Sequence, residues 1–229
     1  MAIAYDSSVD GGTTTATSFT FAFNNVAGNI VFVGVVGDGT VDDVTGVTYN
    51  AVAMTLMPGG LPEFGTRNNY LYYLQNAPTG SHNVVVSAGS SHLLDCGAIS
   101  YSGALTTGQP DATTHSNSGS AASTWTSTLA SIADNCWHML LEQSFHSASE
   151  APGAGAGTTR RVYGATYAEW GFFDSNSAKT PAGSVSLTTT YSTAENGISH
   201  IMASFAPSLV PALKMVSPVL QAVNRASYF

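Results

Sequence analysis

The sequence predicts an all-β protein, an antiparallel β-sandwich of jelly-roll type with a short C-terminal arm. Two observations lead to this class. Apolar and polar residues alternate with a period of two along most of the chain, and about eleven such runs are separated by turn residues. A chain of 229 residues is also long enough to bury a substantial core.

The individual strands follow from the same alternation. In residues 18–23, SFTFAF, three phenylalanines fall on one face, which predicts a strand at the outside of a core. Residues 29–36, NIVFVGVV, are apolar on both faces, which predicts a central strand covered on both sides. Further strands are expected at 44–49, 52–57, 69–75, 82–88, 93–101, 124–129, 136–145, 158–173 (interrupted), 184–191 and 197–205.

Residues 106–123, TTGQPDATTHSNSGSAAS, form the longest polar stretch of low complexity. We expect a long loop or an edge crossing here, inside one sandwich domain that covers residues 1–205. A linker between two halves of the chain is the alternative.

Charged residues are scarce. They make up 9% of the chain, against about 25% in ordinary globular proteins, so solubility depends mainly on Ser, Thr, Asn and Gly. This composition indicates a surface that neighbours cover or that works outside a cell, although a charge-poor monomer is also possible. The net charge of -8, without any basic stripe, argues against nucleic acid as a partner.

The first residues, MAIAYDSSVDGG, have neither the basic region nor the apolar region of a secretory signal. No apolar run approaches the length that spans a bilayer, so membrane insertion is not expected. We therefore expect synthesis in a cytoplasm. Cys96 and Cys136 lie in strand-like runs and are expected to be buried free thiols.

The sequence contains only a weak candidate for a metal site. Asp38, Asp42 and Asp43 in GDGTVDD offer hard oxygen ligands for Ca²⁺, but the spacing and closing Glu of an EF-hand are missing. A polar turn with solvated carboxylates is the favoured interpretation, and we expect no cofactor. The six histidines show no short ligand spacing, so a structural role is expected for each.

The best case for an enzyme is a glycosidase that uses Glu142 in LLEQSF and Glu169 in YAEWGFF, the only carboxylates placed inside strands as candidate acid and base. Without an E-x-D-x-x-E phrase on one strand, we expect no enzymatic activity.

The segment from 158 to 173 also has a binding interpretation. Its cationic and aromatic side chains could stack on a sugar and donate hydrogen bonds to it, but the favoured interpretation is that the alternate aromatic residues fill the core. The candidates for glycan binding are Arg160, Arg161, Tyr163, Tyr167 and Trp170.

One part of the chain resembles known proteins. The run VTYNAVAMTLM, then YLYYLQNAPTGSHNVVVSA and GAISYSGALTTGQPDA, resembles a β-sandwich repertoire of tailed-phage virion proteins and some bacterial surface proteins, over residues 3–115. There, a VTYNGVAMT-like hairpin precedes these strands. Ala51 stands where the repertoire usually has Gly, so the sequence leaves the type of turn at Asn50 and Ala51 open.

The resemblance implies a non-enzymatic virion component, either a capsid decoration, fibre or tail protein, or a module that binds host glycans. Such a protein would reach the virion without a signal peptide because lysis releases the particle. Its partners would be copies of itself and other virion proteins.

The end of the chain differs from the rest. Residues 1–205 hold four cations and fourteen acids, net -10, whereas residues 206–229 hold two cations and no acid, net +2. Ser217 followed by Pro218 can begin a short helix in this arm. The arm is expected to dock either on its own body or on a neighbour in an assembly, through Leu209, Val210, Leu213, Lys214, Val216, Val219, Leu220, Val223 and Arg225.

Overall fold

The computed structural model describes residues 1–38, 42–58, 63–64, 67–144, 150–164 and 169–208. Within these ranges the chain forms strands and connecting segments but no helix, so the predicted all-β class is confirmed. It follows that none of the described residues belongs to a helix long and apolar enough to cross a membrane. The strands are β1 (Ala4–Asn25), β2 (Ile30–Asp38), β3 (Val44–Tyr49), β4 (Val52–Ala53), β5 (Thr55–Leu56), β6 (Glu63–Phe64), β7 (Arg67–Gln75), β8 (Gly80–Ser102), β9 (Ala112–Ala130), β10 (Trp137–Ser144), β11 (Gly153–Ala154), β12 (Thr159–Gly164), β13 (Trp170–Asp174) and β14 (Ser184–Phe205).

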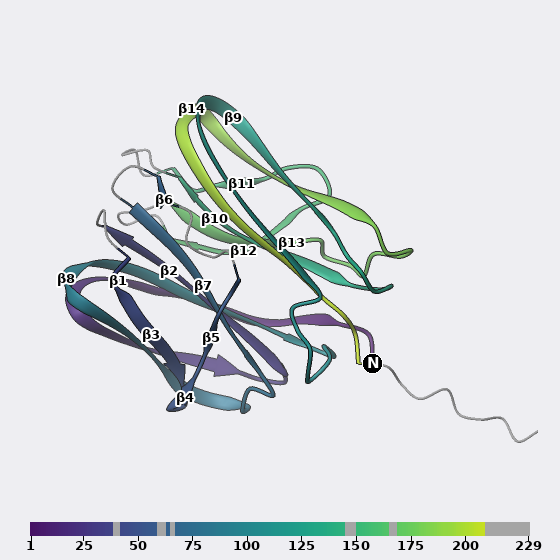
Figure 1. The fold of residues 1–229 in the computed structure, drawn as a ribbon, viewed down its shortest axis with the longest axis horizontal. Coiled ribbons are helices and arrows are strands. Elements are labelled where there is room, and N and C mark those ends of the chain that lie inside the picture. Colours follow the sequence, from purple (N-terminus) through teal and green to yellow (C-terminus); the bar gives the residue numbers. More distant parts are fainter. Residues whose placement is uncertain (39–41, 59–62, 65–66, 145–149, 165–168, 209–229) are drawn as a thin grey trace, which may run out of the picture.

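The strands form two antiparallel sheets that lie against each other (Figure 1). The first sheet takes β1 to β8, with the order β4-β3-β8-β2-β7-β5, and β1 pairs with β8 while β6 pairs with β7. The second sheet takes β9 to β14, with the order β11-β14-β10-β13-β12, and β9 pairs with β14. Each sheet is therefore built from one continuous half of the chain.

The two sheets repeat one plan of connections. In each half a long first strand pairs with a long last strand, β1 with β8 and β9 with β14. In the first sheet the next strand, β2, lies between β8 and β7. In the second sheet the corresponding strand, β10, lies between β14 and β13. The chain is thus two related β units in tandem.

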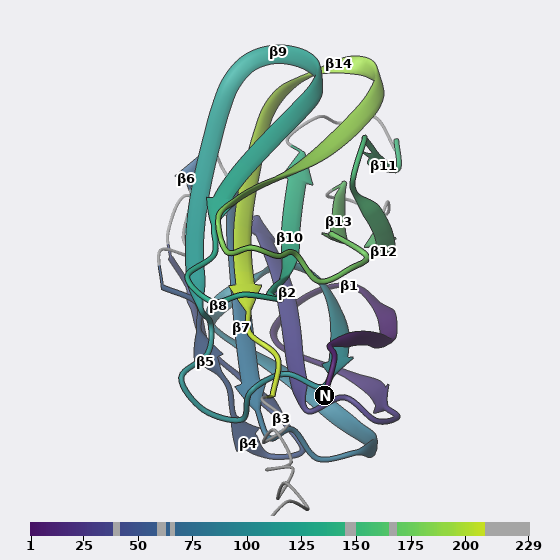
Figure 2. The same cartoon turned by 90° about the vertical axis from the view of Figure 1, so that its right-hand side faces the viewer.

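Both long strand pairs bend, so that each sheet folds over itself. Residues 80–87 of β8 pair with 18–25 of β1, and residues 92–102 pair with 4–16. In the second sheet, residues 184–190 of β14 pair with 124–130 of β9, and residues 198–204 pair with 112–118. Figure 2 shows the bend where β9 and β14 turn over together. The molecule therefore has four β layers, two outer and two inner.

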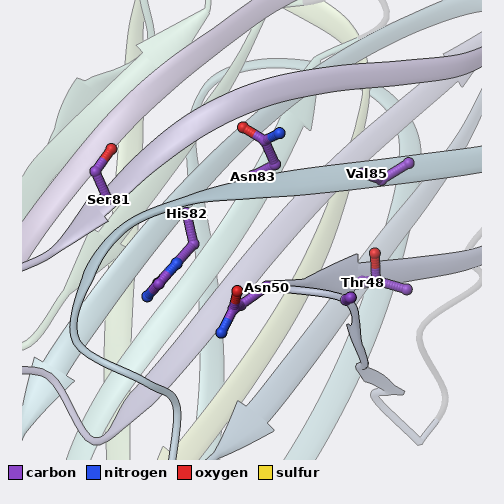
Figure 3. Close-up of a pocket in the computed structure, with 7 residues that line it drawn as sticks. Thr48, Asn50, Ser81, His82, Asn83 and Val85 are labelled. Atoms are coloured by element: carbon purple, nitrogen blue, oxygen red, sulfur yellow. The ribbon is translucent and has the colours of Figure 1, made fainter.

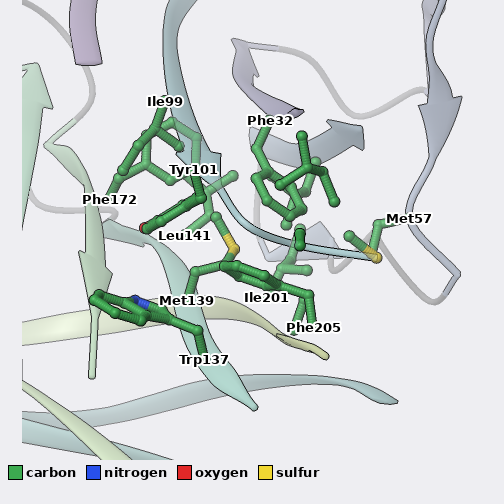
Figure 4. Packing of buried hydrophobic residues seen from close by; sticks show 14 of the residues in the cluster. Phe32, Met57, Ile99, Tyr101, Trp137, Met139, Leu141, Phe172, Ile201 and Phe205 are labelled. Atoms are coloured by element: carbon green, nitrogen blue, oxygen red, sulfur yellow. The ribbon is translucent and has the colours of Figure 1, made fainter. Parts of the chain in front are cut away.

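Three apolar interiors separate these layers. The central one, between the two sheets, is rich in aromatic rings (Figure 4), and it packs Phe32 and Tyr101 of the first sheet against Leu141, Phe172 and Phe205 of the second. Removal of this apolar surface from water is the main force that holds the sheets together.

The other two interiors lie inside each folded sheet. Val31, Val33 and Val35 of β2 line the first. Leu140 and Phe173 lie in the second. Since Ile30 and Phe32 face the central interior, β2 is covered on both faces, as its sequence predicted.

The structure differs from the expected elements in several places. The strand expected at 18–23 is the end of a longer strand, β1, that begins at Ala4, and the strand expected at 52–57 is divided into β4 and β5. The strands expected at 82–88 and 93–101 are one bent strand, β8, and those at 184–191 and 197–205 are one bent strand, β14. The loop expected over 106–123 is instead a strand from Ala112 onward. This part of β9 has no buried side chain because it borders its sheet, so apolar alternation gives no signal there.

The turn at Asn50 and Ala51 is resolved as type I′, because both residues have positive φ, 50° and 59°. It joins β3 to β4 with the pairs Thr48–Ala53 and Tyr49–Val52. Ala51 thus adopts a backbone conformation that usually favours Gly.

Candidate functional site

The surface of the described residues is nearly free of charge. Among the side chains whose exposure is described, only Asp10, Asp42, Asp134 and Arg160 are both charged and exposed. In contrast, five carboxylates are almost fully buried. They are Asp95, Glu142, Glu169, Asp174 and Glu195. A large share of the described acidic side chains therefore act inside the protein.

Glu142 is the centre of one buried polar group. It lies in β10, its side chain is fully buried, and its Oε1 accepts a short hydrogen bond from the hydroxyl of Tyr191. The pKa of Glu142 is raised to about 8, mainly by burial and also by the negative charges of Glu169 and Glu195, against the lowering effect of the Tyr191 bond. At neutral pH this carboxyl is therefore mostly protonated.

The neighbouring acids hold the bend of β14. Glu195 Oε2 accepts a hydrogen bond from Ser144 Oγ at 2.9 Å. Glu169 accepts the backbone N–H of Glu150, and Glu150 in turn accepts the backbone N–H of Ser192. These bonds tie β10 and the segment before β13 to the turning point of β14, which indicates a structural role for the candidate pair Glu142 and Glu169.

Asp43 does the same for the bend of β8. Its Oδ2 accepts the backbone N–H of Ser90 at 2.8 Å and also the Ser90 hydroxyl, and it lies 3.1 Å from Nδ1 of His92. The bond from Ser90 is the main cause that lowers the pKa of Asp43. Asp42 is exposed, and the side chain of Asp38 lies outside the described part.

No metal centre is formed by the described residues, since no three His, Cys, Asp or Glu side chains there are placed to share an ion. Cys96 and Cys136 are buried free thiols. Burial raises the pKa of Cys136 to about 12 and that of Cys96 well above its ordinary value, so neither thiol is activated as a nucleophile.

The candidate glycan-binding residues are dispersed. Trp170 is 1% exposed and donates its indole N–H to Asp95, so its ring faces the protein interior. Arg161 makes a bidentate ion pair with Asp174 at 2.7 and 3.0 Å. Among the described candidates, this leaves Arg160 over the exposed ring of Tyr163, at 4.3 Å, as the accessible pair. Tyr167 lies outside the described residues.

An open depression on the outer layer was not expected from the sequence (Figure 3). It has a volume of about 510 Å³ and is lined by hydroxyl, amide and imidazole groups. The lining residues are Thr48, Asn50, Ala51, Ser81, His82, Asn83 and Val85. The available signal was the alternation in 81–85, which places Ser81, Asn83 and Val85 on one outward face.

His82 borders this depression and is fixed from two sides. Its Nε2 lies 2.9 Å from the carbonyl oxygen of Thr79, and its ring packs edge-on against Tyr49 with centroids 5.5 Å apart. The backbone N–H of Asn50 donates to the carbonyl of Asn83 at 3.0 Å. The depression therefore presents hydroxyl and amide groups beside an imidazole ring that is held in place.

Two other histidines are buried in the second sheet. Burial lowers the pKa of His200 to about 3, and its Nδ1 lies 2.6 Å from the hydroxyl of Ser127. The pKa of His138 is lowered to about 4, mainly by burial and also by the positive charge of Lys179. Both are neutral at physiological pH, which fits the structural role expected for them.

The proposed assembly arm, from Leu209 to Arg225, lies outside the described residues. The described chain leads to it through Ser208, whose N–H donates to the carbonyl of Gly103 at 2.7 Å and whose carbonyl accepts the N-terminal amine of Met1 at 2.6 Å. The chain is thus anchored up to the start of the arm.

Comparison with known proteins gives one structural neighbour to report. No protein family and no curated protein matches the sequence. Among solved structures, the chain is similar to the major capsid protein P2 from bacteriophage PM2, with a TM-score of 0.27 and 6% identity, over 92% of this chain and 98% of that one.

Proposed function

We propose that this protein is a structural component of a viral particle, and that it acts by assembling with other protein subunits. The observation that carries the proposal is the distribution of charge. The chain holds 14 acidic residues, yet only three of the twelve whose exposure is described, Asp10, Asp42 and Asp134, are exposed, and the rest of the exposed surface is mainly neutral. A surface without charges that repel a neighbour or must be desolvated is suited to burial against other subunits.

The sequence resemblance of residues 3–115 to virion β-sandwich proteins supports the same proposal. It favours a capsid decoration, fibre or tail protein, which would reach the virion directly from the cytoplasm of its host. Copies of this chain and other virion proteins are the proposed partners. No role for nucleic acid is proposed.

A non-catalytic role is part of the proposal. Glu142 and Glu169 would have to reach a glycosidic bond, but they are 0% and 2% exposed. Glu142 is already hydrogen-bonded to Tyr191. Neither carboxylate borders the open depression. Their geometry supports a role in holding the second sheet instead.

A second candidate function is binding of a host glycan. The observation in its favour is the depression beside Asn50, His82 and Asn83, because neutral amides, hydroxyls and an imidazole are groups that bind sugar hydroxyls. The ring of Tyr49, which could provide a stacking face, is fully buried, so the assembly role is preferred.

Two measurements on the purified chain test these functions. Light scattering over a wide concentration range should give masses above the 23.6 kDa of one chain. A strict monomer that also fails to attach to capsids or tails would contradict the assembly role. A glycan array should give no signal, and binding that Asn83→Ala abolishes would establish the second function instead.

A further inference from the structure

One border of the second sheet, along the outer arm of β9, has no neighbouring strand in the part of the chain that the structure describes. There, residues 124–130 of β9 pair with β14 alone, so their other edge carries backbone N–H and C=O groups that no described strand pairs (Figure 2). Such an edge is a template for pairing with another chain, and monomeric proteins usually block it with charges, bulges or a covering segment.

The first sheet protects the corresponding edge in two ways. Residues 4–16 of β1 carry Asp6 and the exposed Asp10, register shifts interrupt their pairing with β8, and they are covered from the second sheet, because Ser8 Oγ donates to the carbonyl of Arg161 at 3.3 Å. The outer arm, residues 18–25, has neither a charge nor a register shift, but its end is occupied, because Ser7 Oγ donates to the carbonyl of Asn24 at 2.7 Å and Asp6 accepts the backbone N–H groups of Val26 and Ala27 just beyond it.

β9 has none of these devices in its outer arm. Residues 124–130, TWTSTLA, form seven consecutive pairs with β14 without a register shift, and they contain no charged residue. Thr124, Thr126 and Thr128 are exposed on the outer face. The arm pairs with residues 184–190 of β14, and together they form the outer layer of the second sheet.

From this edge we infer that residues 124–130 of β9 pair antiparallel with the same residues of a second copy of the chain, across a two-fold axis at Ser127. The inference rests on the proposed assembly function and names one of its contacts. It joins the outer layers of two molecules into one continuous sheet, a form of strand addition in which the backbone supplies most of the bonds.

The second copy is the partner because the arm is complementary to itself. With Ser127 on the axis, Thr126 lies opposite Thr128 of the partner subunit on the outer face. Threonines in directly opposite positions stabilise neighbouring antiparallel strands. On the inner face, Trp125 lies opposite Leu129 of the partner subunit, and Trp125 is half-buried in the single chain. No like charges meet, since the arm has none.

Substitution by lysine tests the inference. Thr126→Lys with Thr128→Lys places like charges opposite each other at the axis, and at matched protein concentration the mass from light scattering should fall by one dimerisation step. The matched control is Ala22→Lys with Asn24→Lys, because both residues are exposed on the equivalent arm of β1. The control should keep the mass of the unmodified chain, and all three proteins should keep their melting temperature.

Cysteine pairs test the register. A mixture of Thr126→Cys and Thr128→Cys chains should form an intermolecular disulfide several-fold faster than either variant alone, since directly opposite residues are closest. The native thiols do not interfere because Cys96 and Cys136 are buried. Ala22→Cys serves as the control and should not cross-link.

The outcomes separate the two proposals. Oligomers that persist in both lysine variants would overturn the pairing of β9 but leave the assembly function standing. A mass of 23.6 kDa for the unmodified chain at every concentration would overturn the pairing, and failure to attach to any capsid or tail would then overturn the assembly function as well.

Discussion

Trp170 of β13 donates its indole N–H to Oδ1 of Asp95 in β8 at 2.8 Å, so a buried hydrogen bond joins the two sheets. The ring lies over Gly97, where an added Cβ would be 2.0 Å from Cη2 of Trp170. A side chain at position 97 would therefore force the sheets apart at the centre of the molecule.

This relationship predicts that Gly97→Ala lowers the free energy of unfolding by about 3 kcal/mol or more, because the packed ring cannot move away. Gly46→Ala is the matched control, since Gly46 has nothing within 4 Å of an added Cβ and should tolerate the change. Denaturant unfolding of both variants checks the prediction, and equal midpoints would show that the ring is not held against β8.

A second prediction concerns the pH dependence of stability. The pKa of Glu142 is about 8 in the folded chain and near 4.5 when unfolded, so the unfolded state loses its proton first as the pH rises. Stability should therefore fall between pH 4.5 and pH 8 and stay constant above that range. Glu142→Gln keeps an acceptor for Tyr191 and removes this loss, which amounts to at most about 5 kcal/mol.

Glu150→Gln provides the control with the opposite sign. Hydrogen bonds from Ser192 and Thr193 lower the pKa of Glu150, so its charged form stabilises the fold above the unfolded pKa. The variant should lose stability at neutral pH and match the unmodified chain in acid. Melting curves from pH 3 to pH 9 measure both effects, and parallel curves for Glu142→Gln and the unmodified chain would contradict the buried carboxyl.

A third prediction follows from the type I′ turn. Ala51 has φ of 59°, which costs an L-residue about 1 kcal/mol relative to Gly, so Ala51→Gly should raise the free energy of unfolding by about that amount. Ala53→Gly, in β4 two residues on, should instead destabilise because a strand Gly has more conformational freedom to lose. Thermal melts of the two variants should therefore shift in opposite directions.

These residues show how far the sequence predicts the fold. Alternation located β2, β3, β7 and β10 because each has at least one buried apolar face. It did not locate residues 112–123 of β9, whose small polar side chains bury nothing. The sequence also did not predict that β8 continues through Gly89 as one bent strand. The bend is held by hydrogen bonds to Asp43, which lies far away in the sequence.

The candidate site was predicted less well, for a related reason. Glu142 lies in the run LLEQSF, and its apolar neighbours indicate that it is buried. Only the structure shows that the hydroxyl of Tyr191 donates a hydrogen bond to this buried carboxyl. Trp170 could have faced either a ligand or the core, and the contact with Gly97 and Asp95 decides for the core. The alternation of apolar and polar residues predicts which face of a strand a side chain lies on, but not which residues of other strands pack against that face.

The last prediction separates the C-terminal arm from the body. Deletion of residues 209–229 should leave the melting temperature unchanged, because it keeps the described bonds of Ala206 and Ser208 that hold this end of the body in place. A longer deletion, of residues 206–229, also removes the bonds of Ala206 with Gln109 and Leu105 and that of Ser208 with Gly103. That loss should lower the free energy of unfolding by about 2 to 4 kcal/mol.

If the arm docks on neighbours, the shorter deletion should weaken association while the melting temperature stays the same. Lys214→Glu should weaken association less, and mainly at low salt, because charges at the rim of an interface are screened. Light scattering and thermal melts on the same samples measure both properties. A protein that lacks residues 209–229, melts lower and still associates would show that the arm covers its own body instead.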